Sequence, residues 1–399
     1  MTVPPRPHPA TRSPRVDRVN RLLVRLWDAG LTPRPTLDPD ALRRSADWNA
    51  QPPSPARQGD DADFTQRFDR LCTSVAGEAA LNPLGTTMAH GQLVRVLKQR
   101  QELARYWSAN PEVLDTPLAP PIIVVGQMRS GTTRLHRLLS ADPAHASTRF
   151  CDSWHPVPKR PDMRAIWSAL TLRMGRAINP WLDSIHPMEA TRTEEELGWL
   201  AGALNHAPYE AQWRIPSYTA FGEAHDPTPI YREFLRVLRT DAANRRNADR
   251  PRVLKVPQFS EDVAALMAAF PDARFVRAIR DTKDVVRSSI SLVANQMTIQ
   301  TDRIDMVWLE AEVARKVALR EERMAVAFAA FEGPVSIARF DDLNADWQTE
   351  MARIYAELDM SLSQEARAAM QAEHDRASGG DHRTHSRQLE AFRRPAAAD

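Results

Sequence analysis

The stretch IIVVGQMRSGTT at residues 122–133 decides the fold of this chain. Its first four residues are apolar and β-branched and lie between prolines and a glycine, which is typical of a fully buried central strand. Leu135, Leu138 and Leu139 follow at the spacing of an amphipathic helix. A strand, a glycine-bounded loop and a helix together direct backbone N–H groups and a helix N-terminus at an anion. A tight turn capped by Ser or Thr is the alternative interpretation.

The two glycines of this loop have the G-x4-G spacing of nucleoside-triphosphate P-loops, but Thr132 stands where that motif requires lysine. A P-loop NTPase needs the lysine beside its β- and γ-phosphates and a hydroxyl to hold magnesium. Here the cation lies inside the loop, at Arg129, and two threonines follow the second glycine. The loop therefore suits a compact oxyanion better than a metal-bound triphosphate.

Three further apolar runs predict more strands, at residues 253–256, 274–279 and 335–340. Helical patterns separate them, and residues 304–331 are expected to form one or two helices. Strands that alternate with helices predict an α/β fold with a P-loop-like parallel sheet flanked by helices.

Composition excludes several classes of protein. The chain has 53 Lys and Arg against 51 Asp and Glu, whereas a nucleic-acid binder usually carries a strongly basic domain. Its two cysteines cannot supply a disulfide framework or a four-thiolate zinc site. It contains no long apolar run, and its first residues lack the apolar core of a secretory signal. We expect no nucleic-acid partner, no stable membrane insertion and a cytoplasmic location.

A second candidate anion site follows the strand expected at 274–279. Arg280 would lie at the carboxyl end of a parallel strand, where open α/β sheets bind ligands. Ser288, eight residues further on and in the next helix, can face the same point. An arginine with a hydroxyl suits one terminal phosphate monoester, although a basic residue at a strand end is also common at a solvated edge.

Together the two segments resemble those of sulfotransferases that use 3′-phosphoadenosine 5′-phosphosulfate (PAPS). In that family an R-S/T-G-T-T loop binds the 5′-phosphosulfate, and an R-D-P-x-x-V-x-x-S segment binds the 3′-phosphate. The resemblance covers most of residues 64–392 and is closest to the bacterial group with an N-terminal helical extension. Four other segments contribute to it: W-R-I-P-S-Y at 213–218, R-V-L-K-V-P-Q at 252–258, R-F-D-D-L at 339–343 and G-D-H-R at 380–383.

The resemblance implies a donor site. Arg129 would be the cation on the phosphosulfate, and Arg280 and Ser288 would bind the 3′-phosphate. The 5′-phosphate would lie among the next four residues of the loop, Ser130, Gly131, Thr132 and Thr133. Arg383 would belong to a C-terminal loop that closes over the donor.

Three residues depart from the pattern of the family. Met128 and Thr282 stand where prolines are usual, and Phe259 stands where a histidine is often found. The first two could soften loop geometry without removing atoms that bind an anion. The third removes a polar group from the active site.

Transfer to a hydroxyl also needs a general base within hydrogen-bond reach. Asp152 lies where the resemblance would place a glutamate, and His186 is the second candidate, with Glu194 or Glu195 to orient it. A surface or capping role is the alternative for each. Lys255 is a candidate second cation on the donor, or a lysine that extends from a sheet edge.

We expect two parts along the chain. Residues 1–63 are predicted to be a flexible, Pro-rich extension with a short helix, and residues 64–399 to be the α/β sulfotransferase domain. Within the domain, 64–118 would be a helical lead-in and 150–240 a helical insertion on the acceptor side. Five of the ten tryptophans lie in this insertion, which indicates either an acceptor with apolar surface or core packing.

The sequence thus predicts a sulfotransferase that moves a sulfuryl group by in-line displacement from PAPS to a hydroxyl of a small molecule, lipid or glycan. Such a reaction needs no metal, and the sequence shows no metal-spaced cluster. Two alternatives stay open: a small-molecule kinase that uses ATP and Mg²⁺, and a catalytically degenerate nucleotide-binding protein. The acceptor, the identity of the base and the formation of a homo-oligomer stay open as well.

Overall fold

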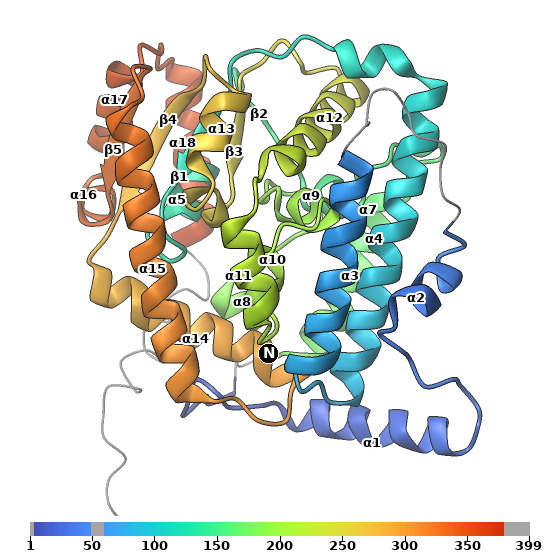
Figure 1. Ribbon diagram of the computed structural model, residues 1–399. Coiled ribbons are helices and arrows are strands. Elements are labelled where there is room, and N and C mark those ends of the chain that lie inside the picture. Colours follow the sequence, from blue (N-terminus) through green and yellow to red (C-terminus); the bar gives the residue numbers. More distant parts are fainter. Residues whose placement is uncertain (1–3, 49–59, 379–399) are drawn as a thin grey trace, which may run out of the picture.

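The structure is a computed structural model, and it describes residues 4–48 and 60–378 (Figure 1). Its described part contains one five-stranded sheet in the order β2-β3-β1-β4-β5, in which every neighbouring pair is parallel. The strands are β1 (Ile122–Val125), β2 (Ala146–Ser147), β3 (Arg252–Lys255), β4 (Arg274–Ile279) and β5 (Val335–Arg339). The predicted α/β class with a P-loop-like parallel sheet is confirmed.

All four predicted strands are present, with ends that differ by at most one residue. The central strand β1 is buried along its whole length, as its uninterrupted apolar run indicates. Strand β2 was missed because it is two residues long and lacks an apolar run. Only its pairing with β3, in which Ala146 lies opposite Arg252, makes it a strand.

Alternate residues of the strands point into two separate hydrophobic cores, as the two-residue period of a strand requires. Ile123 and Phe275 pack on one face, and Ile122 and Val276 on the other. The first face is covered by α12 (Thr228–Arg245), α13 (Val263–Ala269) and α15 (Met306–Ala329). The second is covered by α5 (Thr132–Ala141), α17 (Trp347–Glu357) and α18 (Gln364–Ser378).

A helical part precedes the sheet and forms the right-hand side and the bottom of Figure 1. It consists of α1 (Pro14–Asp28), α2 (Pro39–Ser45), α3 (Asp60–Glu78) and α4 (Pro83–Ala109). The apolar face of α3, formed by Phe64, Phe68, Leu71 and Val75, is buried in a third core. The N-terminal helical extension is thus packed on the rest of the chain.

Residues 4–48, part of the extension for which the sequence predicts flexibility, contact the rest of the chain. The buried guanidinium of Arg6 donates to Ser291 Oγ at 3.1 Å and to the Ser291 carbonyl at 2.7 Å. The Pro4 carbonyl accepts from Trp181 Nε1 at 2.9 Å, and Asn20 Oδ1 accepts from the Leu84 backbone N–H at 2.8 Å. These partners elsewhere in the chain hold the segment in place.

Six helices lie within residues 150–224. They are α6 (Phe150–Trp154), α7 (Arg164–Ile178), α8 (Leu182–Ile185), α9 (Leu197–Gly202), α10 (Ala207–Glu210) and α11 (Pro216–Ala224). Trp181, Trp199 and Trp213 are buried there, so core packing accounts for these three, whereas Trp167 is exposed. Two further helices, α14 (Thr282–Gln300) and α16 (Phe340–Ala345), follow strands β4 and β5. Within the described ranges no helix has both the length and the apolarity to cross a bilayer.

Candidate active site

The loop between β1 and α5 has a backbone that only glycine tolerates at two points. Gly126 has φ 147° and Gly131 has φ 94°. A Cβ added at Gly126 would lie 2.6 Å from the Ala278 carbonyl oxygen, and one at Gly131 would lie 2.8 Å from the Phe340 ring. The Ser130 hydroxyl donates to the Gln127 carbonyl at 2.6 Å and so braces the loop from inside.

Helix α5 begins without a capping side chain. Its N-cap residue is Gly131, and no side-chain hydrogen bond reaches the first turn from that position. The alternative of a turn capped by Ser or Thr therefore does not describe this loop. Uncapped N–H groups at a helix N-terminus favour an anion through hydrogen bonding and through the helix dipole.

The two predicted anion-binding segments meet. Arg129 Nε donates to Ser288 Oγ at 2.9 Å, and Arg280 Nη1 donates to the Arg129 carbonyl at 3.0 Å. Phe340 lies under the Arg280 guanidinium, with 4.0 Å between the guanidinium carbon and the ring centre. The structure thus joins loop 126–133 to the start of α14 at one point.

Arg129 is a partly buried cation. Burial, and then the positive charge of Arg280, lower the pKa of Arg129 to about 10, while Glu195 acts in the opposite direction. Among the described residues, no carboxylate lies within ion-pair distance of the Arg129 guanidinium. Two arginines that repel each other in a partly buried site are both stabilised when a polyanion binds between them.

Lys255 points from the end of β3 toward the start of α5. Its Nζ donates to Thr133 Oγ1 at 3.1 Å and forms an ion pair with Glu195. The side chain is fully buried, and β3 lies inside the sheet, between β2 and β1. The alternative of a lysine that extends from a sheet edge is therefore wrong, and Lys255 is a second cation beside the loop.

His186 lies next to this pair of cations. The carbonyl of Ile185 accepts from Arg129 Nη1 at 3.1 Å, and His186 Nε2 lies 2.9 Å from Glu194 Oε1. Burial alone would raise the pKa of Glu194, but the contact with His186 and the positive charge of Lys255 lower it below its usual value. Glu194 therefore remains an ionised partner that can orient the imidazole.

The structure corrects the expectation that the chain has no cluster with metal-ligand spacing. The side-chain donor atoms of His186, Glu194 and Glu195 all lie within 4.8 Å of one another. Each of these two carboxylates has a cationic or hydrogen-bonding partner, Glu195 in Lys255 and Glu194 in His186. Lys255 thus compensates the charge of Glu195, while Glu194 has a hydrogen-bond partner in His186.

The carboxylate of Asp152 is fully buried and bound by arginines. Arg149 Nε donates to Oδ2 at 2.6 Å, Arg164 Nη1 lies 3.3 Å from Oδ1, and Arg245 Nη1 lies 3.7 Å from Oδ2. The structure places Asp152 in this ion-pair cluster after β2, in no described contact with loop 126–133. Arg383, the remaining predicted donor residue, lies outside the described residues, as does the whole segment 380–383.

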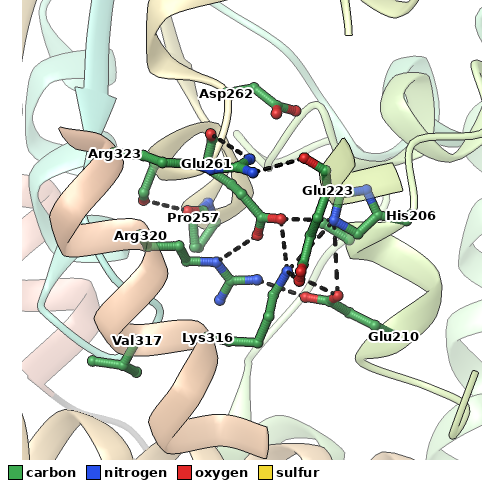
Figure 2. Close-up of polar contacts among 12 residues, drawn as sticks. His206, Glu210, Glu223, Pro257, Glu261, Asp262, Lys316, Val317, Arg320 and Arg323 are labelled. Atoms are coloured by element: carbon green, nitrogen blue, oxygen red, sulfur yellow. Dashed lines mark hydrogen bonds and ion pairs between the residues drawn. The ribbon is translucent and has the colours of Figure 1, made fainter. Parts of the chain in front are cut away.

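Sequence patterns did not reveal a second cluster of charged side chains, which Figure 2 shows. Glu261 is at its centre: His206 Nε2 lies 2.7 Å from Oε1, Lys316 Nζ donates to Oε1 at 2.6 Å, and Arg320 Nε donates to Oε2 at 3.1 Å. Lys316 Nζ also lies 3.1 Å from Glu210 and 2.9 Å from Glu223. We refer to these six residues as the buried ionic cluster.

The buried ionic cluster also brings together His206, Glu210 and Glu223 at metal-ligand spacing. The Lys316 ammonium binds both carboxylates and so already occupies the position of a cation. The lysine and arginine stand four residues apart on α15, a spacing that puts them on one helix face. That spacing is visible in the sequence, but their partners on α10, on α11 and after β3 are not.

Two cavities adjoin each other between α14, α15 and the helices before the sheet. One has a volume of about 350 Å³ and the other of about 40 Å³, and Trp213, Met297 and Trp308 line both. The smaller cavity reaches Met128 of the loop, and Lys316 and Arg320 of the buried ionic cluster form part of its wall. An apolar space with a charged end therefore reaches loop 126–133.

Residues 120–364 match the model of the sulfotransferase family, and the chain belongs to this family. Two curated relatives are the omega-hydroxy-beta-dihydromenaquinone-9 sulfotransferases Stf3 of Mycobacterium bovis and Mycobacterium tuberculosis. Each is 28% identical over 190 residues, which are 45% of this chain and 47% of the relative. The match thus spans about half the length of the curated relatives.

Two solved structures are similar over most of their length. The crystal structure of sulfotransferase STF1 from Mycobacterium tuberculosis has a TM-score of 0.73 and 28% identity and covers 89% of this chain and 98% of its own. Sulfotransferase STF9 from Mycobacterium avium has a TM-score of 0.70 and 21% identity, and the match covers 84% of this chain and 86% of STF9. The second comparison shows the same fold.

Proposed function

We propose that the chain transfers a sulfuryl group from PAPS to a hydroxyl of an apolar acceptor. The observation that carries the proposal is the meeting of Arg129, Arg280 and Ser288, since it joins two cation-bearing segments around an uncapped helix N-terminus. PAPS carries an anhydride-linked anion at one end and an isolated phosphate at the other. Membership of the sulfotransferase family supports this donor over other bisphosphorylated ligands.

In the proposed complex the loop from Ser130 to Thr133 binds the 5′-phosphate, and Arg280 and Ser288 bind the 3′-phosphate. The acceptor oxygen forms a bond to sulfur while the bond between sulfur and the bridging oxygen of the 5′-phosphate breaks. Arg129 and Lys255 stabilise the charge that develops on the leaving phosphate. The products are a sulfate ester and 3′,5′-bisphosphorylated adenosine.

We propose His186 as the general base. Its Nε2 faces Glu194, so Nδ1 is the nitrogen left to accept the proton of the acceptor hydroxyl. Glu194 then stabilises the imidazolium that forms. Asp152 is the weaker candidate, because its carboxylate is neutralised by Arg149 and Arg164.

The acceptor is proposed to be an alcohol with a large apolar part. The two cavities support this, since tryptophan and methionine side chains line both and the smaller one reaches Met128. The names of the curated relatives also describe a hydroxylated menaquinone as acceptor. A long apolar molecule would enter through the larger cavity and present its hydroxyl at the loop.

A donor-binding protein without turnover is the second candidate function. It is favoured by Phe259, which stands where the family often has a histidine and is packed in the core, with its ring 5.7 Å from that of Phe234. This chain therefore lacks that polar group. His186 with Glu194 is the pair that would have to replace it.

Titration calorimetry tests the donor, and transfer of labelled sulfate tests the reaction. We expect 3′,5′-bisphosphorylated adenosine to bind without metal and more tightly than ATP with Mg²⁺; the reverse order would support a kinase. Labelled PAPS is then offered to a panel of phenols, sterols, prenyl alcohols and glycans. Donor binding without transfer to any member would favour the non-catalytic alternative.

A further inference from the structure

Helix α7 exposes its apolar face and buries a mostly polar one, whereas an ordinary surface helix buries its apolar face. The residues that it buries are Arg164, Ser168 and Leu172. The large apolar residues that it exposes are Met163 at its N-cap, Ile166, Trp167, Leu170 and Met174, with exposed fractions of 41–59%. We refer to these five residues as the apolar stripe.

The apolar stripe is continuous. At 100° per residue its members fall within about a third of the helix circumference, on the side opposite the buried residues. The other large exposed apolar residues of the described chain are scattered over other elements. Clustered exposed apolar side chains mark a surface that binds a partner or a membrane, whereas scattered ones are ordinary.

The unpaired charges beside the apolar stripe are positive, since Asp162, next to Met163, forms an ion pair with Arg164. No Asp or Glu occurs between Met163 and Ile178. Arg160 and Arg173 are exposed and have no ion-pair partner among residues 4–48 and 60–378. An amphipathic helix with tryptophan on its apolar face and arginine beside it is typical of proteins that lie in a lipid interface.

Helix α1 adds to this charge. It touches the end of α7, where Arg15 Nη1 donates to the Ala177 carbonyl at 2.9 Å. Three further arginines of α1 are exposed and have no ion-pair partner in the described part of the chain: Arg18, Arg21 and Arg25. Basic residues near a bilayer are attracted to anionic headgroups, and this attraction weakens as the salt concentration increases.

We infer that the apolar stripe of α7 docks on the surface of an anionic lipid bilayer, with the arginines of α7 and α1 at the headgroups. A second copy of the chain is a poorer occupant, because a two-fold interface on the stripe would bring Arg173 toward its own copy. Docking here would also serve the site. Arg176 of α7 donates to the Met188 carbonyl at 2.6 Å, two residues after His186, so the helix is tied to the segment that carries the proposed base.

Vesicle flotation of the full chain tests this inference without donor or acceptor. We expect the chain to float with vesicles of equimolar phosphatidylcholine and phosphatidylglycerol, and to bind pure phosphatidylcholine much more weakly. The triple variant Trp167→Gln, Leu170→Gln, Met174→Gln should lower the partition coefficient by about tenfold or more. The control Val307→Gln, Val326→Gln removes two exposed apolar residues of α15 and should bind as the wild type does.

A second variant tests the contribution of positive charge to vesicle binding. Arg160→Glu with Arg173→Glu should weaken binding by about tenfold and reduce its salt dependence, whereas Arg367→Glu, an exposed arginine of α18, should leave it unchanged. Circular dichroism and donor binding check that each variant is folded.

The inference is overturned if the wild type stays free with anionic vesicles, or if the triple variant floats as the wild type does. It is also overturned if light scattering shows a dimer that the triple variant converts to a monomer while neither protein binds vesicles. Because vesicle binding is read without turnover, its failure leaves the proposed sulfuryl transfer untouched. Failure of transfer likewise leaves the docking surface untouched.

Discussion

Arg129 Nε and Ser288 Oγ lie 2.9 Å apart, although 159 residues separate them in the chain. The contact exists because β1 and β4 are neighbours in a parallel sheet, so the loop after β1 and the helix after β4 begin at the same edge. Arg280 completes the arrangement by binding the Arg129 carbonyl. A ligand with two phosphate-like ends can therefore touch both segments at once, and the donor half of the proposed function depends on this.

Replacement of Arg129 by alanine should weaken the binding of 3′,5′-bisphosphorylated adenosine by about 10- to 100-fold, the range for a lost charge-assisted hydrogen bond. Titration calorimetry at fixed salt measures the change. The matched control is Arg367→Ala, which removes an exposed arginine from α18. Equal affinities in the wild type and the Arg129 variant would remove this residue from the donor site.

Replacement of Ser288 by alanine should reduce affinity selectively for the 3′-phosphate. We expect about a tenfold loss for 3′,5′-bisphosphorylated adenosine and little change for adenosine 5′-phosphate. The neighbouring Ser289 is equally buried but has no hydrogen-bond partner for its hydroxyl in the described residues, so Ser289→Ala is the control. A similar loss for both nucleotides would place Ser288 elsewhere in the site.

Replacement of His186 by alanine should lower kcat by about 100-fold or more while donor affinity is largely kept, since general-base catalysis contributes at that level. Glu194→Gln should lower kcat less than His186→Ala does, because it removes only the counter-charge of the imidazolium. A kcat that His186→Ala leaves unaltered would refute the assignment of the base.

Replacement of Asp152 by asparagine should act on stability. The variant leaves Arg149 and Arg164 without a buried counter-charge, and breaking such a cluster costs about 3–5 kcal/mol of unfolding free energy. Chemical denaturation followed by circular dichroism measures the loss. If stability is instead unchanged and kcat falls more than in His186→Ala, Asp152 is the base.

Glu196 predicts a dependence of stability on pH. Burial raises its pKa to about 7, against hydrogen bonds from Thr148 and from the Lys255 backbone N–H. Between the unfolded value of about 4.3 and the folded value, the native state binds more protons, so this residue makes stability fall as pH rises. The stability that the protonated carboxyl of Glu196 contributes is fully present below its pKa in the unfolded state, and it is lost above its pKa in the folded state.

The variant Glu196→Gln removes this titration. Relative to the wild type, its unfolding free energy should therefore increase between pH 5 and pH 7.5 by up to about 3 kcal/mol. Denaturation curves at several pH values measure the difference. A difference that is constant over this range would show that Glu196 is ionised throughout.

Local chemistry was sufficient to predict the parts of the fold that depend on nearest neighbours. The run at 122–125 is buried because it is apolar and β-branched, and the loop after it needs glycine at positions 126 and 131 because of its backbone angles. The buried face of α3 follows from helical periodicity in the same way. Arg129, Arg280 and Ser288 could be proposed for the donor site because each stands in a short segment with its own spacing.

Tertiary structure alone decided which distant charges meet. Asp152 resembled a catalytic carboxylate until its pairing with Arg149 and Arg164 was known, and Lys255 gained its role only when β3 proved to be an inner strand. The buried ionic cluster joins α10, α11 and α15 to the segment after β3, and residues 4–48 are ordered by partners hundreds of residues away. The physical reason is that periodicity and turn chemistry act over a few residues, whereas the energy of a buried charge depends on every group that the fold brings within a few ångströms of it.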